Sequence, residues 1–277
     1  MTMIKRILRE PRIVFGLAFL LLLCGIAIFA PFLVPYDPLE IYPSETLQPP
    51  SARHLFGTDN LGRDVFSRVL FGTRYSLALG LLAIAISAGL GVILGLVSGF
   101  AGGAVDAAIM RAVDVGLAFP SVLLALLVIS VIGPGLTSIV IAIGVSSTPP
   151  FIRIVRGSVL VIKEMTFIEA ARASGVGNSR ILLRHILPEV FAPALTMATL
   201  GLANAIFSAS SLSFLGFGAR PPTPEWGVLV SSARHQLRAA WWISTFSGLA
   251  IMISVLSINV LGDGLRDILD PKLRGKL

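Results

Sequence analysis

The side chains that most often carry out chemistry are few in this chain and lie far apart. Its three histidines, His54, His185 and His235, fall in different polar segments, and none has a partner at metal-ligand spacing. The single cysteine, Cys24, lies inside an apolar run, where it forms no intrachain disulfide and fills space. A catalytic site needs a nucleophile, a base or a metal cluster within mutual reach. We therefore expect no enzymatic activity, no metal and no cofactor in this chain.

Residues 57–64, Gly-Thr-Asp-Asn-Leu-Gly-Arg-Asp, imitate a phosphate-binding loop. A Walker sequence has Lys and then Ser or Thr after its second glycine, because the lysine contacts the phosphates and the hydroxyl binds magnesium. Here Arg63 and Asp64 stand in those positions, and an aspartate repels phosphate. The pattern predicts a capped turn that leads into an interfacial helix, and it predicts that this chain binds no ATP by itself.

A polar, basic stretch between apolar runs carries the clearest functional pattern, Glu169-Ala-Ala-Arg-Ala-Ser-Gly175, with Pro188 further on. The two alanines offer a small-residue surface that a partner can approach closely, and Glu169 is a negative charge among arginines. Gly175 permits a backbone reversal, and Pro188 limits where the following helix can begin. The stretch predicts a short helix, a turn and a second helix at a membrane surface, suited to docking a soluble partner.

This stretch resembles the EAA loop of membrane subunits of ABC importers, written E-A-A, three residues, G, nine residues, I, any residue, L-P. The chain departs from it at His185, where the pattern has Ile. In order along the chain, residues 54–65, 213–218, 221–227 and 261–267 also resemble the second permease subunit of dipeptide, oligopeptide and nickel ABC importers. We refer to residues 157–189 as the EAA segment. The resemblance assigns these residues to docking an ATPase: Glu169, Ala170, Ala171, Arg172, Gly175, Leu187 and Pro188.

The resemblance implies an all-α, polytopic membrane protein with the type I ABC importer transmembrane fold. It implies a homologous permease subunit as partner in a heterodimer, two ATPase subunits that bind the ATP, and an extracytoplasmic substrate-binding protein. The chain would form half of the translocation pathway in a bacterial or archaeal cytoplasmic membrane. The implied cargo is a dipeptide or oligopeptide, with nickel and glutathione as related alternatives.

Composition independently places the chain in a lipid bilayer. Hydrophobic residues make up 55% and charged residues 13%, with a mean hydropathy of +0.88, whereas soluble domains are about 25% charged. The net charge of +7 is spread between apolar runs, with no aromatic-basic stripe, so we expect no nucleic-acid partner. The first apolar run is 22 residues long, too long for a signal peptide.

Six apolar segments are long enough to cross a bilayer. We expect one transmembrane domain, residues 13–277, after a cytoplasmic segment 1–12, with a proline-containing periplasmic loop over 35–73 and another loop over 216–240. The predicted spans are residues 13–34, 76–99, 112–132, 136–155, 191–212 and 241–261. In the second span, Ser87, Gly91, Gly95 and Gly99 recur every four residues and predict a close helix contact.

Charges and prolines in the middle spans predict local structure. Arg111 and Asp114 are three residues apart and should form a structural ion pair. Pro120 should kink the third span, and the Pro149–Pro150 pair should break or kink the fourth. Arg153 and Arg156 follow that pair and are expected to reach the membrane surface.

Asn204, Ser208 and Ser211 share one face of the fifth span. Two interpretations stay open. The hydroxyls and the amide either hydrogen-bond between helices, or they line a water-accessible pathway, since polar groups that faced lipid would be unsatisfied.

The distribution of basic residues predicts the orientation. If the N-terminus is cytoplasmic, 15 of the 22 Lys and Arg residues fall on the cytoplasmic side, together with the EAA segment, and 7 fall outside. The competing class of protein is a self-sufficient secondary transporter or channel. Such proteins commonly carry intramembrane ionisable residues and internal repeats, and neither stands out here.

Overall fold

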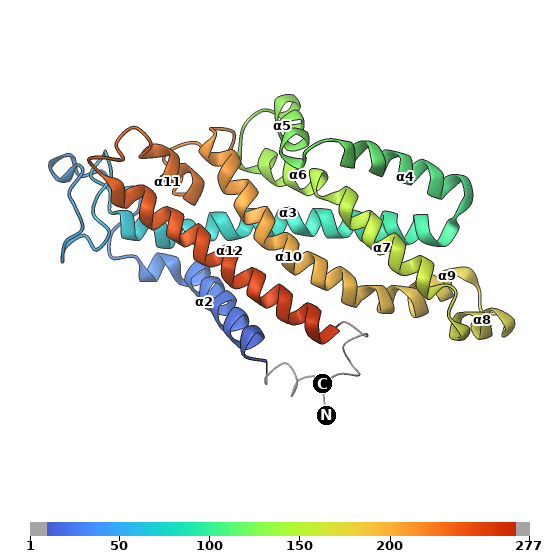
Figure 1. The fold of residues 1–277 in the computed structure, drawn as a ribbon. Helices are drawn as coiled ribbons and strands as arrows, with labels where there is room; N and C mark the ends of the chain where they lie inside the picture. Colours follow the sequence, from blue (N-terminus) through green and yellow to red (C-terminus); the bar gives the residue numbers. More distant parts are fainter. Residues whose placement is uncertain (1–9, 270–277) are drawn as a thin grey trace.

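The computed structural model describes residues 10–269, and the all-α class predicted from the sequence is confirmed. The basic residues predicted to be cytoplasmic at positions 5, 6 and 9, and those in the tail at 272–276, lie outside the described residues. The helices form one elongated bundle (Figure 1). They are α2 (Pro11–Leu33), α3 (Val65–Ala101), α4 (Gly103–Ala118), α5 (Ser121–Ile132), α6 (Leu136–Ser146), α7 (Thr148–Ile162), α8 (Thr166–Ala173), α9 (Asn178–Ile181), α10 (Leu187–Phe214), α11 (Trp226–Ser232) and α12 (Trp241–Leu269), with a short 3₁₀ turn at Pro43–Glu45 and a π-helical turn at Leu182–Ile186.

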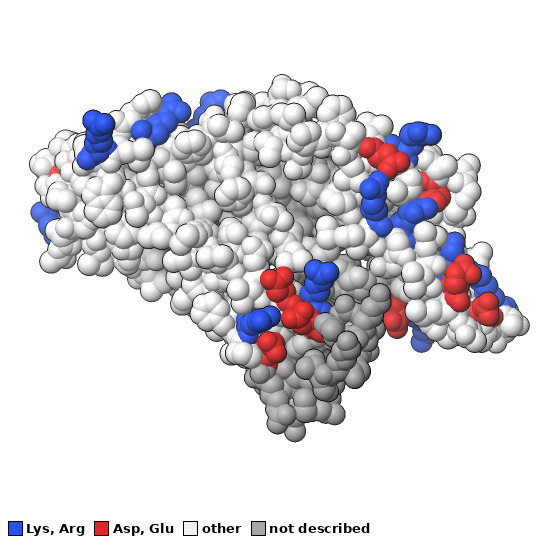
Figure 2. Space-filling view, viewed as in Figure 1, with Lys and Arg blue, Asp and Glu red and all other residues white. Residues whose placement is uncertain are grey.

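The bundle has two distinct ends. The EAA end carries α8 and α9, and the loop end carries α11 and the irregular residues 34–64 (Figure 1). Five helical stretches are long and apolar enough to cross a membrane, and there are six if the bent pair α4 and α5 counts as one span. Charged side chains lie at the two ends and beside the termini, and the middle of this face carries none (Figure 2). The prediction of a membrane bundle with about six spans is confirmed.

Helix α3 is the central element, and its small residues let α7 pack closely against it. A Cβ added at Gly91 would lie 2.4 Å from the Phe151 Cβ, and one at Gly95 would lie 2.6 Å from the Val155 Cβ. Gly99 faces Val159 in the same way. The predicted close contact therefore exists, because residues four apart on one helix meet residues four apart on the other.

The second span is longer than predicted. Helix α3 begins at Val65, and its 37 residues extend over about 55 Å at 1.5 Å per residue, well beyond a hydrocarbon core of about 30 Å. The Asp64 carboxylate caps it by accepting a hydrogen bond from the Ser67 backbone N–H at 2.7 Å. The predicted capped turn is present, and the helix that it starts is continuous with the second span.

Both predicted proline sites interrupt a span. The third is split at residues 119–120, and α4 and α5 meet at a bend of 99°, far larger than the predicted kink. The fourth is interrupted at Ser147, where α6 ends and α7 begins with Pro149 in its first turn. Helix α7 then runs to Ile162, so the first residues of the EAA segment are still helical.

The predicted pairing of Arg111 with Asp114 was wrong. The Asp114 carboxylate instead accepts a 2.5 Å hydrogen bond from Arg153, which lies on α7. Arg156 forms a two-point ion pair with Asp106, both N–O distances being 2.6 Å. These two arginines therefore join α7 to α4. From the sequence we predicted only that they reach the membrane surface.

At the loop end, side chains of the spans hold the irregular segments. Arg68 of α3 donates hydrogen bonds to the carbonyl oxygens of Pro38 at 2.8 Å and Pro222 at 3.3 Å. The indole N–H of Trp242 donates to the Thr58 carbonyl at 3.0 Å, and that of Trp226 donates to the Val69 carbonyl at 2.9 Å. The predicted loop 216–240 thus contains a helix, α11, that is packed into the bundle.

Candidate functional site

The EAA segment folds as a helix, a turn and a second helix. Helix α8 ends at Ala173, and Gly175 has a φ of 78°, a left-handed conformation that residues with a Cβ rarely adopt. Around this turn the N–H groups of Gly175 and Val176 donate to the carbonyls of Arg172 and Ala171 at 2.9 and 3.0 Å. Helix α9 then starts at Asn178. The reversal predicted from Gly175 is therefore present in the structure.

Buried isoleucines fix this segment to the bundle and leave the motif on its surface. Ile168, Ile181 and Ile186 are fully buried and belong to the main apolar core. Of the residues assigned to docking, Ala171 and Leu187 are half-buried. The other five form the outward-facing part of the motif: Glu169, Ala170, Arg172, Gly175 and Pro188.

Pro188 lies in the first turn of α10, which begins at Leu187, as predicted from the limit that a proline sets on the start of a helix. The helical stretch is continuous from Asn178 to Phe214, and it passes Pro188 through the π-helical turn Leu182–Ile186. In that turn the Leu187 N–H bonds to the Leu182 carbonyl, five residues back. A proline within a helix removes one i to i−4 hydrogen bond, and a local change of register accommodates it. His185 is half-buried in this turn, and the neighbouring Ile186 occupies the apolar position instead.

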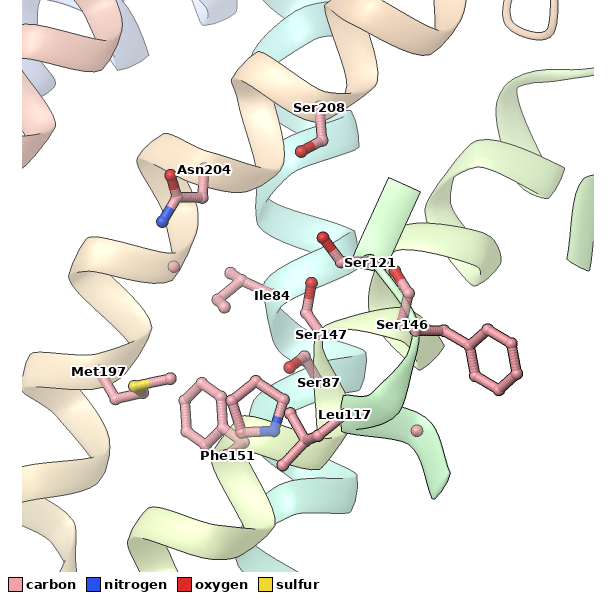
Figure 3. Close-up of a pocket in the computed structure, with 14 residues that line it drawn as sticks. Ile84, Ser87, Leu117, Ser121, Ser146, Ser147, Phe151, Met197, Asn204 and Ser208 are labelled. Atoms are coloured by element: carbon pink, nitrogen blue, oxygen red, sulfur yellow. The ribbon is translucent and has the colours of Figure 1, made fainter. Parts of the chain in front are cut away.

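A pocket of about 520 Å³ lies between α3, α10 and the two interrupted spans (Figure 3). Both breaks contribute to its wall, through residues such as Phe119 and Ser147. Hydroxyl and amide groups supply its polarity, and none of the described residues that line it carries a charge. The lining residues are Ile84, Ser87, Gly116, Leu117, Phe119, Ser121, Ser146, Ser147, Pro150, Phe151, Met197, Gly201, Asn204 and Ser208.

Two of the three polar residues predicted on the fifth span reach this pocket. Asn204 and Ser208 line it and point toward it in Figure 3. Ser211 is not among the lining residues, and its hydroxyl donates to the Phe207 carbonyl at 2.8 Å. Sequence reasoning missed the opposite wall, although Pro120 and Pro149 signalled that two helices break there.

The loop that imitates a phosphate site is occupied by its own side chains. His54 is fully buried, and its ring nitrogens lie 2.9 Å from Asp64 and 3.1 Å from Glu45. The Arg63 guanidinium pairs with Asp59 at 2.7 Å. The charged groups of this cluster are directed at one another. This geometry fits a structural role, because the hydrogen-bond donors of the cluster are already bonded to its own carboxylates and are not directed at a phosphate site.

Membrane spans, a helix–turn–helix at one end and an uncharged pocket among the spans fit a membrane transport subunit. The chain belongs to the family of binding-protein-dependent transport system inner membrane components, whose sequence model matches residues 91–275. Residues 2–50 match the N-terminal transmembrane domain of oligopeptide transport permease C. Membership implies ATPase and substrate-binding partners and a bacterial inner-membrane location, and it favours an importer subunit over a self-sufficient secondary transporter or channel.

Relatives match over nearly the whole chain. The chain is 45% identical to the di/tripeptide transport system permease protein DppC of Pseudomonas aeruginosa, covering 94% of this chain and 88% of that protein. It is 44% identical to the glutathione transport system permease protein GsiD of Pectobacterium atrosepticum, covering 98% and 90%. The fold is similar to that of the MetNI methionine ABC transporter in an inward-facing conformation, with a TM-score of 0.59 at 17% identity, covering 73% of this chain and 96% of that chain.

Proposed function

We propose that this chain forms half of the translocation pathway of an ATP-driven importer for dipeptides or a closely related small peptide such as glutathione. The names of its relatives support this cargo. We further propose a heterodimer with a homologous permease subunit, two ATPase subunits at the EAA end, and an extracytoplasmic binding protein at the loop end. ATP is bound by the ATPase subunits, and this chain performs no catalysis of its own.

The observation that carries the coupling role is the surface of the EAA segment. Its buried isoleucines hold α8 and α9 against the core, while Glu169, Ala170 and Arg172 stay exposed. A small-residue surface with fixed charges that is rigidly attached to the spans suits docking of a soluble subunit.

A continuous helix connects this surface with the pocket. From Asn178 to Asn204 the stretch extends for about 39 Å at 1.5 Å per residue. A displacement of α9 by the ATPase subunits is therefore expected to move the pocket wall on α10. Asn204, Ser208 and Ser211 remain our proposed pathway lining, with Ser211 nearer the loop end than the pocket.

The proposal is tested by two substitutions in the EAA segment. Glu169→Lys reverses the exposed charge, and Gly175→Trp places a side chain at a left-handed φ of 78°. We expect both to reduce peptide uptake to background and to weaken co-purification with the ATPase subunits, while membrane insertion is retained because neither touches a span.

The matched control is Glu164→Lys, which makes the same charge change at an exposed residue of the same segment outside the motif. It should leave uptake and co-purification close to the wild-type values. Normal uptake and normal ATPase binding in the two motif variants would show that the EAA segment is not the coupling element.

A further inference from the structure

The pocket between the interrupted spans contains a buried hydroxyl group without a partner. Ser87 is fully buried, its Oγ has no hydrogen-bond partner, and it lines the pocket. Some serines in the other helices donate to a carbonyl one turn back, as Ser254 does to Ala250 at 2.7 Å. Ser213 and Ser247 are likewise buried without a partner, but of these three unpaired serines only Ser87 lines the pocket. A buried polar group that makes no hydrogen bond costs about 1–3 kcal/mol. In a pocket wall, such a group is available to a water or a ligand that enters the pocket.

The break between α4 and α5 supplies backbone groups to the same pocket. Gly116 and Leu117 belong to the last turn of α4, and Ser121 is the first residue of α5. The start of α5 has no side-chain cap, and Pro120 has no N–H to donate. The end of α4 therefore carries carbonyls with partial negative charge, and the start of α5 carries N–H groups with partial positive charge.

The wall on α10 faces these groups with an amide. Asn204 offers both a donor and acceptors, and the Ser208, Ser146 and Ser147 hydroxyls lie around the same space (Figure 3). A peptide group likewise has one donor and one acceptor, and a free dipeptide ends in one ammonium and one carboxylate. Uncharged donors and acceptors together with two helix ends of opposite polarity match such a zwitterion, and no side chain in the lining forms an ion pair with either terminus.

We propose that this pocket binds the backbone and termini of a dipeptide during its passage, with Ser87 and Asn204 as hydrogen-bonding partners, irrespective of the charge of the dipeptide's side chains. This inference rests on the proposed function and adds a binding site and its chemical class. The alternative is a pocket that only separates packed helices. In that case Ser87→Ala removes an unsatisfied hydroxyl, which stabilises the protein and leaves transport unchanged.

The test uses the complete importer, with both permease subunits, the ATPase subunits and the binding protein, reconstituted in vesicles. Uptake of alanyl-alanine, alanyl-lysine and alanyl-glutamate is measured for Ser87→Ala and Asn204→Leu. We expect each variant to lower uptake by about five- to ten-fold, the effect of one lost hydrogen bond, and to lower it equally for the three probes. Thermal stability of Ser87→Ala should equal or exceed that of the wild type, and co-purification with the ATPase subunits should be unchanged. Ser254→Ala is the matched control, because it removes a buried hydroxyl that already has a partner.

Each other outcome contradicts the inference at a defined point. Wild-type uptake of all three probes by the Ser87 and Asn204 variants would make the pocket a packing feature, while the proposed function stands. A loss confined to one probe would mean that the pocket reads side chains and not the backbone. Absence of uptake by the wild-type complex would overturn the proposed cargo, and this inference with it.

Discussion

At the residue scale, the buried carboxyl group of Glu225 has four hydrogen-bond partners. It caps α11 by accepting hydrogen bonds from the backbone N–H groups of Gly227 and Val228, both at 3.0 Å. The hydroxyls of Ser76 on α3 and Ser210 on α10 lie 3.3 and 3.4 Å from its Oε1. One buried side chain therefore joins three helices. Burial raises the pKa of Glu225 above its ordinary value of 4.5, against the opposing effect of the two backbone donors.

Two replacements of Glu225 distinguish the effect of its hydrogen bonds on stability from the effect of its charge. Glu225→Ala leaves the cap and two hydroxyls without their acceptor and should lower the free energy of unfolding by about 2 kcal/mol or more. Glu225→Gln keeps an acceptor at the cap and should stay close to the wild type. Thermal unfolding in detergent measures both. A Glu225→Ala variant as stable as the Gln variant would contradict the role of the side chain in joining the helices.

The comparison of the wild type with Glu225→Gln also predicts that the difference in their stability depends on pH. Because the folded state holds the carboxyl proton more tightly than the unfolded state, the contribution of Glu225 to stability is fully present below 4.5 and is lost as the pH rises through the raised pKa. The stability of the wild type relative to Glu225→Gln should therefore fall with rising pH over that interval. A difference that stays constant with pH would show that burial does not govern this carboxyl group.

At the scale of elements, the contact between α3 and α7 depends on glycine. Gly95→Leu would place a Cβ 2.6 Å from the Val155 Cβ and 3.0 Å from the Ile152 carbonyl oxygen, so the two helices would have to separate. Overpacking of this kind costs about 1–3 kcal/mol. We expect a lower unfolding temperature for the complex in detergent.

Gly89→Leu is the matched control on the same helix. Position 89 is exposed, and an added Cβ would meet nothing within 4 Å. This variant should unfold at the wild-type temperature or slightly above it, because leucine favours helix more than glycine does. Equal losses at positions 89 and 95 would mean that backbone freedom, and not the contact with α7, explains the glycines.

Local patterns predicted much of this architecture, and long-range packing decided the rest. The apolar segments, the Gly175 turn and the glycine spacing of α3 follow from neighbours in the sequence. Pro120 signals a break, but the 99° between α4 and α5 depends on the elements against which each half packs. The partner of Asp114 was predicted wrongly because Arg153, 39 residues away in the sequence, takes the place of Arg111 in the adjacent turn.

The pocket could be predicted only in part for the same reason. Asn204 and Ser208 share a helix face, and that periodicity is visible in the sequence. Ser87 was expected only to pack closely, because its spacing with the glycines shows a small-residue ridge and cannot show that one hydroxyl of the ridge lacks a partner. The π-helical turn before Pro188 likewise has no local signature in the sequence.

At the scale of the whole molecule, residues 45 and 225 lie at the loop end and residue 170 lies at the EAA end. The positive-inside rule then predicts which end faces the cytoplasm. A reporter that is active only in the periplasm should be active when fused after residue 45 or 225 and silent after residue 170. The reverse pattern would place the EAA segment outside and exclude its contact with cytoplasmic ATPases.

The attachments at the loop end have a mechanical consequence. Arg68 and Trp242 tie irregular segments to α3 and α12, and Trp226 ties α11 to α3, so this end is a fixed support. A force applied through α8 and α9 at the opposite end cannot be relieved there by rearrangement of loops. We expect strain to concentrate instead where helices are interrupted, at residues 119–120 and 147. The pocket between these two breaks would then change its volume before any other part of the bundle moves.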